Sequence, residues 1–206
     1  MRIGLISDVH ANLDALARAL DLLERAGVDK LVCLGDVVEK GPEPDRVVER
    51  LDALAVVTVQ GNHDANAVRH AELEPRRCGY ASDTVAWLAA LPRTREYVWA
   101  DRHVALAHSS LAPDDWSGVR PGAMSKPMRR RLRSSDADVF ALGHTHIPMW
   151  TSVAASGREV WLANPGSTHA GRCPLGPTCA VLSLPDVRLE VYSLQSGARV
   201  RLRGCG

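Results

Sequence analysis

Aspartate, histidine and asparagine side chains recur in this sequence in five short motifs, and their types suit the binding of divalent metal ions. Carboxylate oxygen, imidazole nitrogen and amide oxygen, without a thiolate, are ligands for ions such as Mn²⁺, Fe²⁺ and Zn²⁺. Burying so many ionisable groups together would cost much free energy without a compensating cation. Because the set is larger than one ion takes, it favours two ions about 3.5–4 Å apart that share one carboxylate. The motifs are Asp8-Val9-His10, Gly35-Asp36, Gly61-Asn62-His63-Asp64, His108 and Gly143-His144-Thr145-His146.

Each motif follows a short apolar segment that we expect to be a buried strand. Apolar residues at helical spacing between the first three segments predict a β-α-β-α-β order, which implies parallel pairing with right-handed crossovers. Ligands bind at the C-terminal edge of such sheets, so we expect the five motifs to converge there. Gly35, Gly61 and Gly143 would let the backbone turn sharply and would keep side chains out of a crowded site. The apolar segments comprise residues 2–7, 31–34, 55–59, 104–107 and 139–142.

The rest of the sequence has a weaker pattern. Residues 64–81 are polar and predict irregular structure, and residues 110–127, rich in Pro, Gly, Ser and Asp, predict a loop. The other predicted elements are helices at 13–23, 47–54 and 82–91, a hairpin of 97–99 with 104–107, a helical turn at 128–133, and strands at 160–163, 180–184 and 187–194.

The composition is that of one ordinary globular domain. The chain has 206 residues, of which 46% are hydrophobic and 24% charged, which excludes a disordered chain, a collagen-like fibre and a coiled coil. A formal net charge of +1 gives no general attraction to nucleic acid or an anionic membrane. No stretch reaches roughly 18 apolar residues, and Asp8 and His10 interrupt the first apolar run, so we expect a cytoplasmic protein without membrane contact. The five cysteines lack a C-x-x-C motif and predict free thiols, with a Cys173–Cys179 disulfide as the alternative.

The five motifs, in their order along the chain, resemble the signature of the calcineurin-like metallophosphoesterases. The short length and the segment Asn164-Pro165-Gly166-Ser167 are most similar to the small prokaryotic YfcE-type phosphodiesterases. The resemblance spans about residues 2–195. It implies an α/β fold, a four-layer α-β-β-α sandwich with two mixed β-sheets, in one metallophosphoesterase domain over residues 1–195. Residues 65–100 could form a small cap, and residues 196–206 are expected to be a flexible tail.

The resemblance also implies a role for each motif residue. His63 would not bind metal; it would contact the scissile phosphate and protonate the leaving group, while Asp64 would fix a loop. Arg172 is a weaker candidate for a substrate contact. The first metal would be held by Asp8, His10, Asp36 and His146. The second metal would be held by Asp36, Asn62, His108 and His144, with Asp36 bridging. The implied catalytic residues are His63, Asp36 and Asn62.

The implied activity is dimetal-dependent hydrolysis of a small, nucleotide-like phosphodiester or phosphomonoester by in-line attack of a metal-bridging hydroxide. Mn²⁺ is the preferred metal, with Fe, Zn or Ni as alternatives. Where protein phosphatases have Gly-Asp-x-x-Asp-Arg-Gly, this chain has Glu39-Lys40-Gly41 after Gly35-Asp36, which argues against that class and, more weakly, against a dinucleoside tetraphosphatase. The alternatives are a non-catalytic metal-binding scaffold of the same fold and a nuclease acting on single-stranded DNA or RNA, which is not favoured. The oligomeric state is not predicted.

Overall fold

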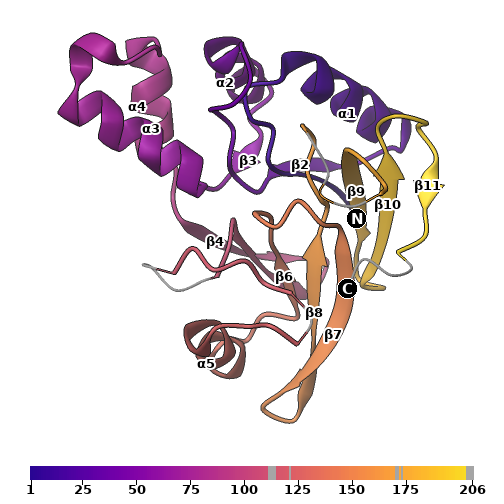
Figure 1. Ribbon diagram of the computed structural model, residues 1–206. Helices are drawn as coiled ribbons and strands as arrows, with labels where there is room; N and C mark the ends of the chain where they lie inside the picture. Colours follow the sequence, from indigo (N-terminus) through magenta and orange to yellow (C-terminus); the bar gives the residue numbers. More distant parts are fainter. Residues whose placement is uncertain (111–114, 121, 170–171, 173, 203–206) are drawn as a thin grey trace.

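The computed structural model describes residues 1–110, 115–120, 122–169, 172 and 174–202, and it contains two mixed β-sheets flanked by helices (Figure 1). In the first sheet the strand order is β11-β10-β9-β1-β2-β3, and in the second it is β4-β5-β6-β8-β7. The first sheet consists of β1 (Arg2–Ile6), β2 (Lys30–Cys33), β3 (Val57–Thr58), β9 (Thr178–Ser183), β10 (Arg188–Ser193) and β11 (Arg199–Val200). The second consists of β4 (Thr94–Trp99), β5 (Arg102–Ala107), β6 (Val139–Ala141), β7 (Met149–Ala155) and β8 (Arg158–Asn164).

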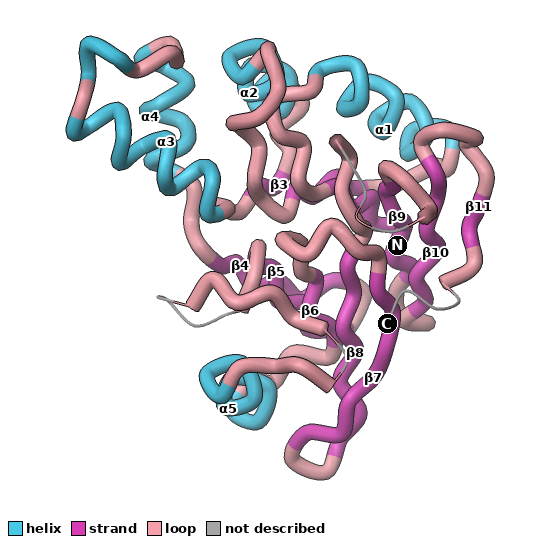
Figure 2. The backbone as a smooth tube through the Cα atoms, viewed as in Figure 1, coloured by secondary structure: helices cyan, strands magenta, loops and turns pink. Residues whose placement is uncertain are grey.

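Five α-helices and one 3₁₀ helix connect the described strands. Among the described residues, no helix is long and apolar enough to cross a lipid bilayer. In Figure 2 α1 and α2 lie beside the first sheet, and α5 lies at the opposite side of the molecule beside the second sheet. The helices are α1 (Leu13–Arg25), α2 (Pro44–Ala53), α3 (Asn62–Leu73), α4 (Ser82–Ala90) and α5 (Lys126–Ser134), with the 3₁₀ helix at Pro75–Arg77.

Three apolar clusters hold these layers together. Successive side chains of a strand point to opposite faces of its sheet, so neighbouring residues belong to different clusters. In β2 and the residue after it, Val32 and Leu34 pack between the two sheets, whereas Cys33 packs beneath α1 and α2. On the far side, Phe140 of β6 packs against Met128 of α5. The order helix, sheet, sheet, helix confirms the predicted four-layer α-β-β-α sandwich.

The N-terminal half follows the expected β-α-β-α-β order. Strand β1 pairs in parallel with β2, and β2 in parallel with β3. Helix α1 begins where Asn12 Oδ1 accepts a hydrogen bond from the Ala15 amide at 3.0 Å, and it ends before Gly27, whose φ of +67° suits glycine. The strands therefore deliver their following motifs to one edge of the first sheet.

Three segments differ from the sequence-based expectation. Helix α3 (Asn62–Leu73) occupies much of the stretch predicted to be irregular; it buries only Asp64 and Ala67, so it lacks the apolar stripe that marks a helix. Strand β7 (Met149–Ala155) was not predicted, because as an edge strand it is mostly half-exposed. Strand β11 (Arg199–Val200) pairs with β10 inside the stretch expected to be a flexible tail.

The described cysteines are free thiols, as predicted. Cys33 and Cys179 are buried and Cys78 is half-buried. Cys173, the alternative partner for Cys179, lies outside the described residues.

Candidate metal centre

The motif side chains come together above the C-terminal ends of strands from both sheets. Sheet one supplies the segments after β1, β2 and β3, and sheet two those after β5 and β6. The ligand atoms lie within 4.8 Å of one another in three groups. These groups are Asp8 with His10 and His146, His10 with Asp36 and His63, and Asp36 with His108 and His144.

The first predicted ligand set lies where the segments that follow β1, β2 and β6 meet. Nε2 of His10 lies 3.3 Å from Nε2 of His146. Nε2 of His146 lies 3.1 Å from Oδ1 of Asp8, and Nε2 of His10 lies 3.9 Å from Oδ2 of Asp36. Four lone-pair atoms directed at one small volume are the arrangement that a cation would stabilise.

The second predicted set adjoins the first through Asp36. Oδ2 of Asp36 lies 3.1 Å from Nε2 of His108, which in turn is 3.3 Å from Nδ1 of His144. Oδ1 of Asn62 is 2.8 Å from the same His144 nitrogen. The same Asp36 oxygen thus faces both sets, which is the geometry that a shared carboxylate requires.

Backbone carbonyls orient two of the imidazoles. Nδ1 of His10 lies 3.3 Å from the Val38 carbonyl oxygen, and Nδ1 of His108 lies 2.6 Å from that of Leu34. A carbonyl only accepts hydrogen bonds, so in each ring Nδ1 carries the proton and donates it. When the ring is neutral, Nε2 is thereby left as an acceptor that points into the cluster, as in metal-binding histidines.

The carboxylate of Asp8 provides a direct test of whether a cation fits. Its Oδ2 accepts hydrogen bonds from Ser7 Oγ at 2.6 Å and from the His144 amide at 3.1 Å. Its Oδ1 is buried and, among the described residues, accepts no hydrogen bond of good geometry, although Nε2 of His146 lies 3.1 Å away. An ionised oxygen left unsatisfied in the interior costs considerable free energy, so the donor set fits a divalent cation at this position.

Charge compensation within the cluster is strong. Burial alone would raise the pKa of Asp8 and Asp36, yet the neighbouring imidazoles hold both below the ordinary value. Burial would lower the pKa of His108, but Asp36 raises it to about 9. Burial lowers the pKa of His10 to about 4. The two buried carboxylates therefore stay ionised and ready to bind a cation.

The backbone of the predicted metal ligands is strained at several positions. Several predicted ligands have a positive φ, a region that non-glycine residues seldom adopt and that clusters at functional sites. A Cβ on Gly61 would lie 2.2 Å from the Asp36 amide nitrogen, and one on Gly143 would lie 2.0 Å from Ser7 Oγ, so both glycines are required by close approach. The φ values are +53° for Asp8, +49° for His10, +53° for Asp36, +68° for His144 and +59° for His146.

His63 lies at the edge of the cluster, in the first turn of α3. Its amide donates to Asp36 Oδ1 at 2.9 Å, and its Nε2 is 3.9 Å from Asp36 Oδ2. Its Nδ1 contacts the carboxylate of Glu39. Sequence reasoning did not assign Glu39 a role; its place three residues after Asp36, on the same loop, was the available signal.

Asp64 joins the loop after β2 to the start of α3. The amides of Val37 and Val38 donate to its Oδ1 at 2.8 and 3.2 Å, and the Gly61 amide donates to its Oδ2 at 2.8 Å. The carboxylate is fully buried, and burial raises its pKa to about 6. Asp64 therefore fixes the two segments that carry Asp36 and Asn62, in agreement with the predicted loop-fixing role.

Lys40, His169 and the backbone of Arg172 lie near the first ligand set. Nζ of Lys40 lies 2.8 Å from Nε2 of His10. His169 is half-buried; its ring centroid is 5.8 Å from that of His10, and Asn12 Nδ2 lies 3.1 Å from its Nδ1. The backbone amide of Arg172 donates to the His146 carbonyl at 3.1 Å, while its side chain is exposed.

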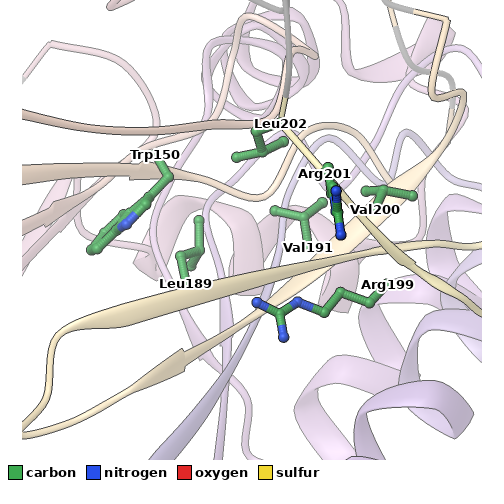
Figure 3. Close-up of a pocket in the computed structure, with 7 residues that line it drawn as sticks. All are labelled: Trp150, Leu189, Val191, Arg199, Val200, Arg201 and Leu202. Atoms are coloured by element: carbon green, nitrogen blue, oxygen red, sulfur yellow. The ribbon is translucent and has the colours of Figure 1, made fainter.

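A separate hollow of about 570 Å³ lies between β7, β10 and the C-terminal strand. Figure 3 shows Trp150 and Leu189 on one side of it and Arg201 beside Val191 on the other. The described residues that line it include no carboxylate and no imidazole.

Comparison with known proteins agrees with this geometry. The family model of the calcineurin-like phosphoesterase superfamily domain matches residues 1–186. Phosphodiesterase YfcE of Escherichia coli is 28% identical over 178 residues, which cover 81% of this chain and 79% of YfcE. A symmetrical bis(5'-nucleosyl)-tetraphosphatase of Paracidovorax citrulli is 26% identical, over 79% of this chain and 63% of that protein.

Among solved structures, a metallophosphoesterase from Sphaerobacter thermophilus aligns with a TM-score of 0.71 and 26% identity, covering 98% of this chain and 90% of that one. Its likeness extends over both sheets, and the family match includes all five motifs. With the cluster of aspartate, histidine and asparagine side chains at the edge of the two sheets, these findings show that the chain belongs to the calcineurin-like phosphoesterase superfamily, among the small members of the YfcE type.

Proposed function

We propose that the protein is a dimetal phosphoesterase that hydrolyses a small, nucleotide-like phosphodiester or phosphomonoester. The observation that carries this proposal is Oδ2 of Asp36, which lies 3.1 Å from Nε2 of His108 and 3.9 Å from Nε2 of His10 and so faces two ligand sets at once. The names of two relatives, a phosphodiesterase and a nucleosyl tetraphosphatase, support phosphate-ester chemistry.

The proposed ligands are those expected from the motifs. When bound, divalent cations would acidify a water molecule and offset the negative charge of the phosphoryl group. We favour Mn²⁺, with Fe, Zn or Ni as alternatives, because the donors are oxygen and nitrogen without sulfur. The first ion would be held by Asp8, His10, Asp36 and His146. The second would be held by Asp36, Asn62, His108 and His144.

The chain's own residues would orient the ester and supply a proton. Asn62 Oδ1 faces His144, which leaves its amide NH₂ to donate to a phosphate oxygen. His63 would donate a proton from Nε2 to the leaving oxygen, while Glu39 holds the opposite ring nitrogen and so sets the ring's orientation. Arg172, next to His146 through its backbone, is proposed as an outer contact for the ester's phosphate.

Removal and return of metal tests the proposal. The protein is stripped with a chelator and assayed with bis-p-nitrophenyl phosphate and p-nitrophenyl phosphate before and after addition of Mn²⁺. We expect turnover only after metal is restored. Full activity in a rigorously metal-free sample would refute the dimetal assignment.

The variant His63→Ala tests the proton donor. We expect two bound metals and a fall in turnover of about 10²–10⁴-fold, the usual contribution of a general acid. His70→Ala is the matched control, because His70 is exposed on the same helix. Unchanged turnover in His63→Ala would remove this residue from the mechanism.

The same assays separate the alternatives. No turnover of any ester with metal bound would support a non-catalytic scaffold. A strong preference for single-stranded DNA or RNA over small esters and cyclic nucleotides would support a nuclease.

A further inference from the structure

We propose that Trp116, backed by Arg93, forms a stacking surface for the base of a nucleotide ester beside the second ligand set. This inference rests on the proposed phosphoesterase function and narrows its substrate class. The Trp116 ring centroid lies 6.3 Å from that of His108, with the planes at 67°. The guanidinium carbon of Arg93 lies 3.5 Å from the Trp116 ring centroid. Two planar groups thus adjoin a predicted metal ligand.

Core packing does not account for the position of Trp116. The side chain is half-buried, and none of the three apolar clusters of the described residues includes it. Its segment was predicted to be loop, and Trp116 comes eight positions after His108 in the sequence. A role at the site accounts for an indole that lies beside His108 and outside the apolar clusters.

The loop that carries Trp116 is held in place from several sides. Asp115 Oδ1 accepts a hydrogen bond from the Ser117 amide at 2.9 Å, and Ser125 Oγ donates to Asp115 Oδ2. Ser109 Oγ donates to the Asp115 carbonyl at 3.1 Å, which ties the loop to the residue after His108. A binding surface that is already ordered loses less conformational entropy when a ligand arrives.

The same loop also packs closely against His144, another member of the second ligand set. A Cβ on Gly118 would lie 2.9 Å from Cγ2 of Thr145 and 3.2 Å from Cδ2 of His144. The loop therefore approaches the His144 ring within van der Waals contact, a distance that only glycine permits. The position of the indole is coupled to the ligand set on both flanks.

Arg93 adds charge to this surface and links it to another part of the chain. It lies in the connection between α4 and β4, within the stretch of 65–100 that could form a cap. A guanidinium over an indole is a cation–π pair, and both planes can stack with a nucleobase. In a nucleotide, one ribose joins base and phosphate. A base stacked here therefore leaves its phosphate on the side of the His108 ligand set.

Stacking on a π face is tolerant of base identity. The expected specificity is a preference for nucleotides over base-free sugar phosphates, without a strong choice among the four bases. Removing one such stacking partner is expected to weaken nucleotide binding about 5- to 160-fold.

Equilibrium binding tests the inference without relying on turnover. The Mn²⁺-loaded protein in a His63→Ala background, which suppresses hydrolysis, is titrated calorimetrically with AMP and with ribose 5-phosphate. We expect AMP to bind more tightly by the factor above. Trp116→Ala should reduce AMP affinity to that of ribose 5-phosphate, and Trp116→Phe should keep most of the preference. Metal content and melting temperature of each variant report whether the fold is intact.

A turnover assay with one common leaving group gives a second readout. Thymidine 5'-p-nitrophenyl phosphate and ethyl p-nitrophenyl phosphate both release p-nitrophenol, so the two esters differ only in the group that remains on the phosphate. Because only the thymidine ester carries a base, only its kcat/KM should fall in Trp116→Ala. Equal binding of AMP and ribose 5-phosphate to the parent protein would overturn the inference, as would equal losses for both ligands in Trp116→Ala. If AMP is preferred through Trp116 but no ester is hydrolysed, the inference stands and the proposed function fails.

Discussion

Replacement of Asp64 by Asn should destabilise the protein far more than a change of one non-hydrogen atom suggests. The carboxylate is fully buried and accepts hydrogen bonds from the amides of Val37, Val38 and Gly61 at 2.8, 3.2 and 2.8 Å. Asparagine can keep its oxygen toward the two valine amides. Its NH₂ group would then face the Gly61 amide, so one buried donor loses its acceptor and a second donor opposes it.

The expected cost follows from these contacts. Hydrogen bonds to a charged group contribute about 1.5–3 kcal/mol each, and leaving a buried donor unsatisfied costs about 1–3 kcal/mol. We therefore expect Asp64→Asn to lower the free energy of unfolding by about 3 kcal/mol. At about 2–4 °C per kcal/mol for a chain of this size, the melting temperature should fall by about 6–12 °C. Metal affinity should fall as well, because Asp64 links the segments that carry Asp36 and Asn62.

Urea denaturation followed by circular dichroism measures the change, with an unaltered m-value as the sign that both end states are comparable. Asp83→Asn is the matched control: Asp83 is an exposed aspartate in the first turn of α4, and its replacement should stay within about 0.5 kcal/mol. If Asp64→Asn unfolds within 0.5 kcal/mol of the parent protein, the reasoning about these three hydrogen bonds is wrong.

Three further predictions concern the metal ligands, the proton donor and the thiols. Asp36→Asn should weaken Mn²⁺ binding by both ligand sets, since this carboxylate faces both, and should therefore lower the number of Mn²⁺ ions per protein measured by plasma mass spectrometry. Retention of two tightly bound ions would contradict a shared ligand. Glu39→Gln should lower kcat about 10-fold or more with little change in KM and should move the pH profile of kcat, because it removes the charge that holds the His63 ring. An unchanged pH profile would mean that Glu39 has only a structural role. Burial raises the pKa of Cys179 to about 12 and also raises that of Cys33, so iodoacetamide at pH 8 should label Cys78 before either in the native protein, as peptide mass spectrometry can check.

The site takes side chains from both sheets, so we expect it to be sensitive to changes in the packing between them. Asp8 and Asp36 follow strands of the first sheet, while His108 and His144 follow strands of the second. A change that alters packing between the sheets moves the two halves of the cluster relative to each other. Residues such as Leu5, in the apolar layer between the sheets, are therefore expected to influence metal affinity without touching a ligand.

The sequence by itself determined the features that depend on local pattern. Continuous apolar runs such as residues 2–7 predicted buried strands, the leucine spacing of residues 13–23 predicted α1, and polar motifs directly after strands predicted a ligand cluster at one sheet edge. These inferences hold because side-chain period and strand-end position are set by neighbours along the chain. The edge strand β7 and helix α3 have no such pattern. β7 forms by pairing with the next strand, β8, and the start of α3 is joined to the loop after β2 through Asp64.

Only the tertiary structure decided which atoms meet. Asp36 presents one oxygen to two ligand sets because loops from both sheets meet there. Glu39 meets His63 between the segments that follow β2 and β3, and Trp116 lies beside His108 on the segment that follows β5. The residues involved are separated by up to 138 positions between Asp8 and His146 and meet within 3.1 Å. Such contacts are set by the packing of the layers and by left-handed backbone turns after the strands, and neither leaves a periodic trace in the sequence.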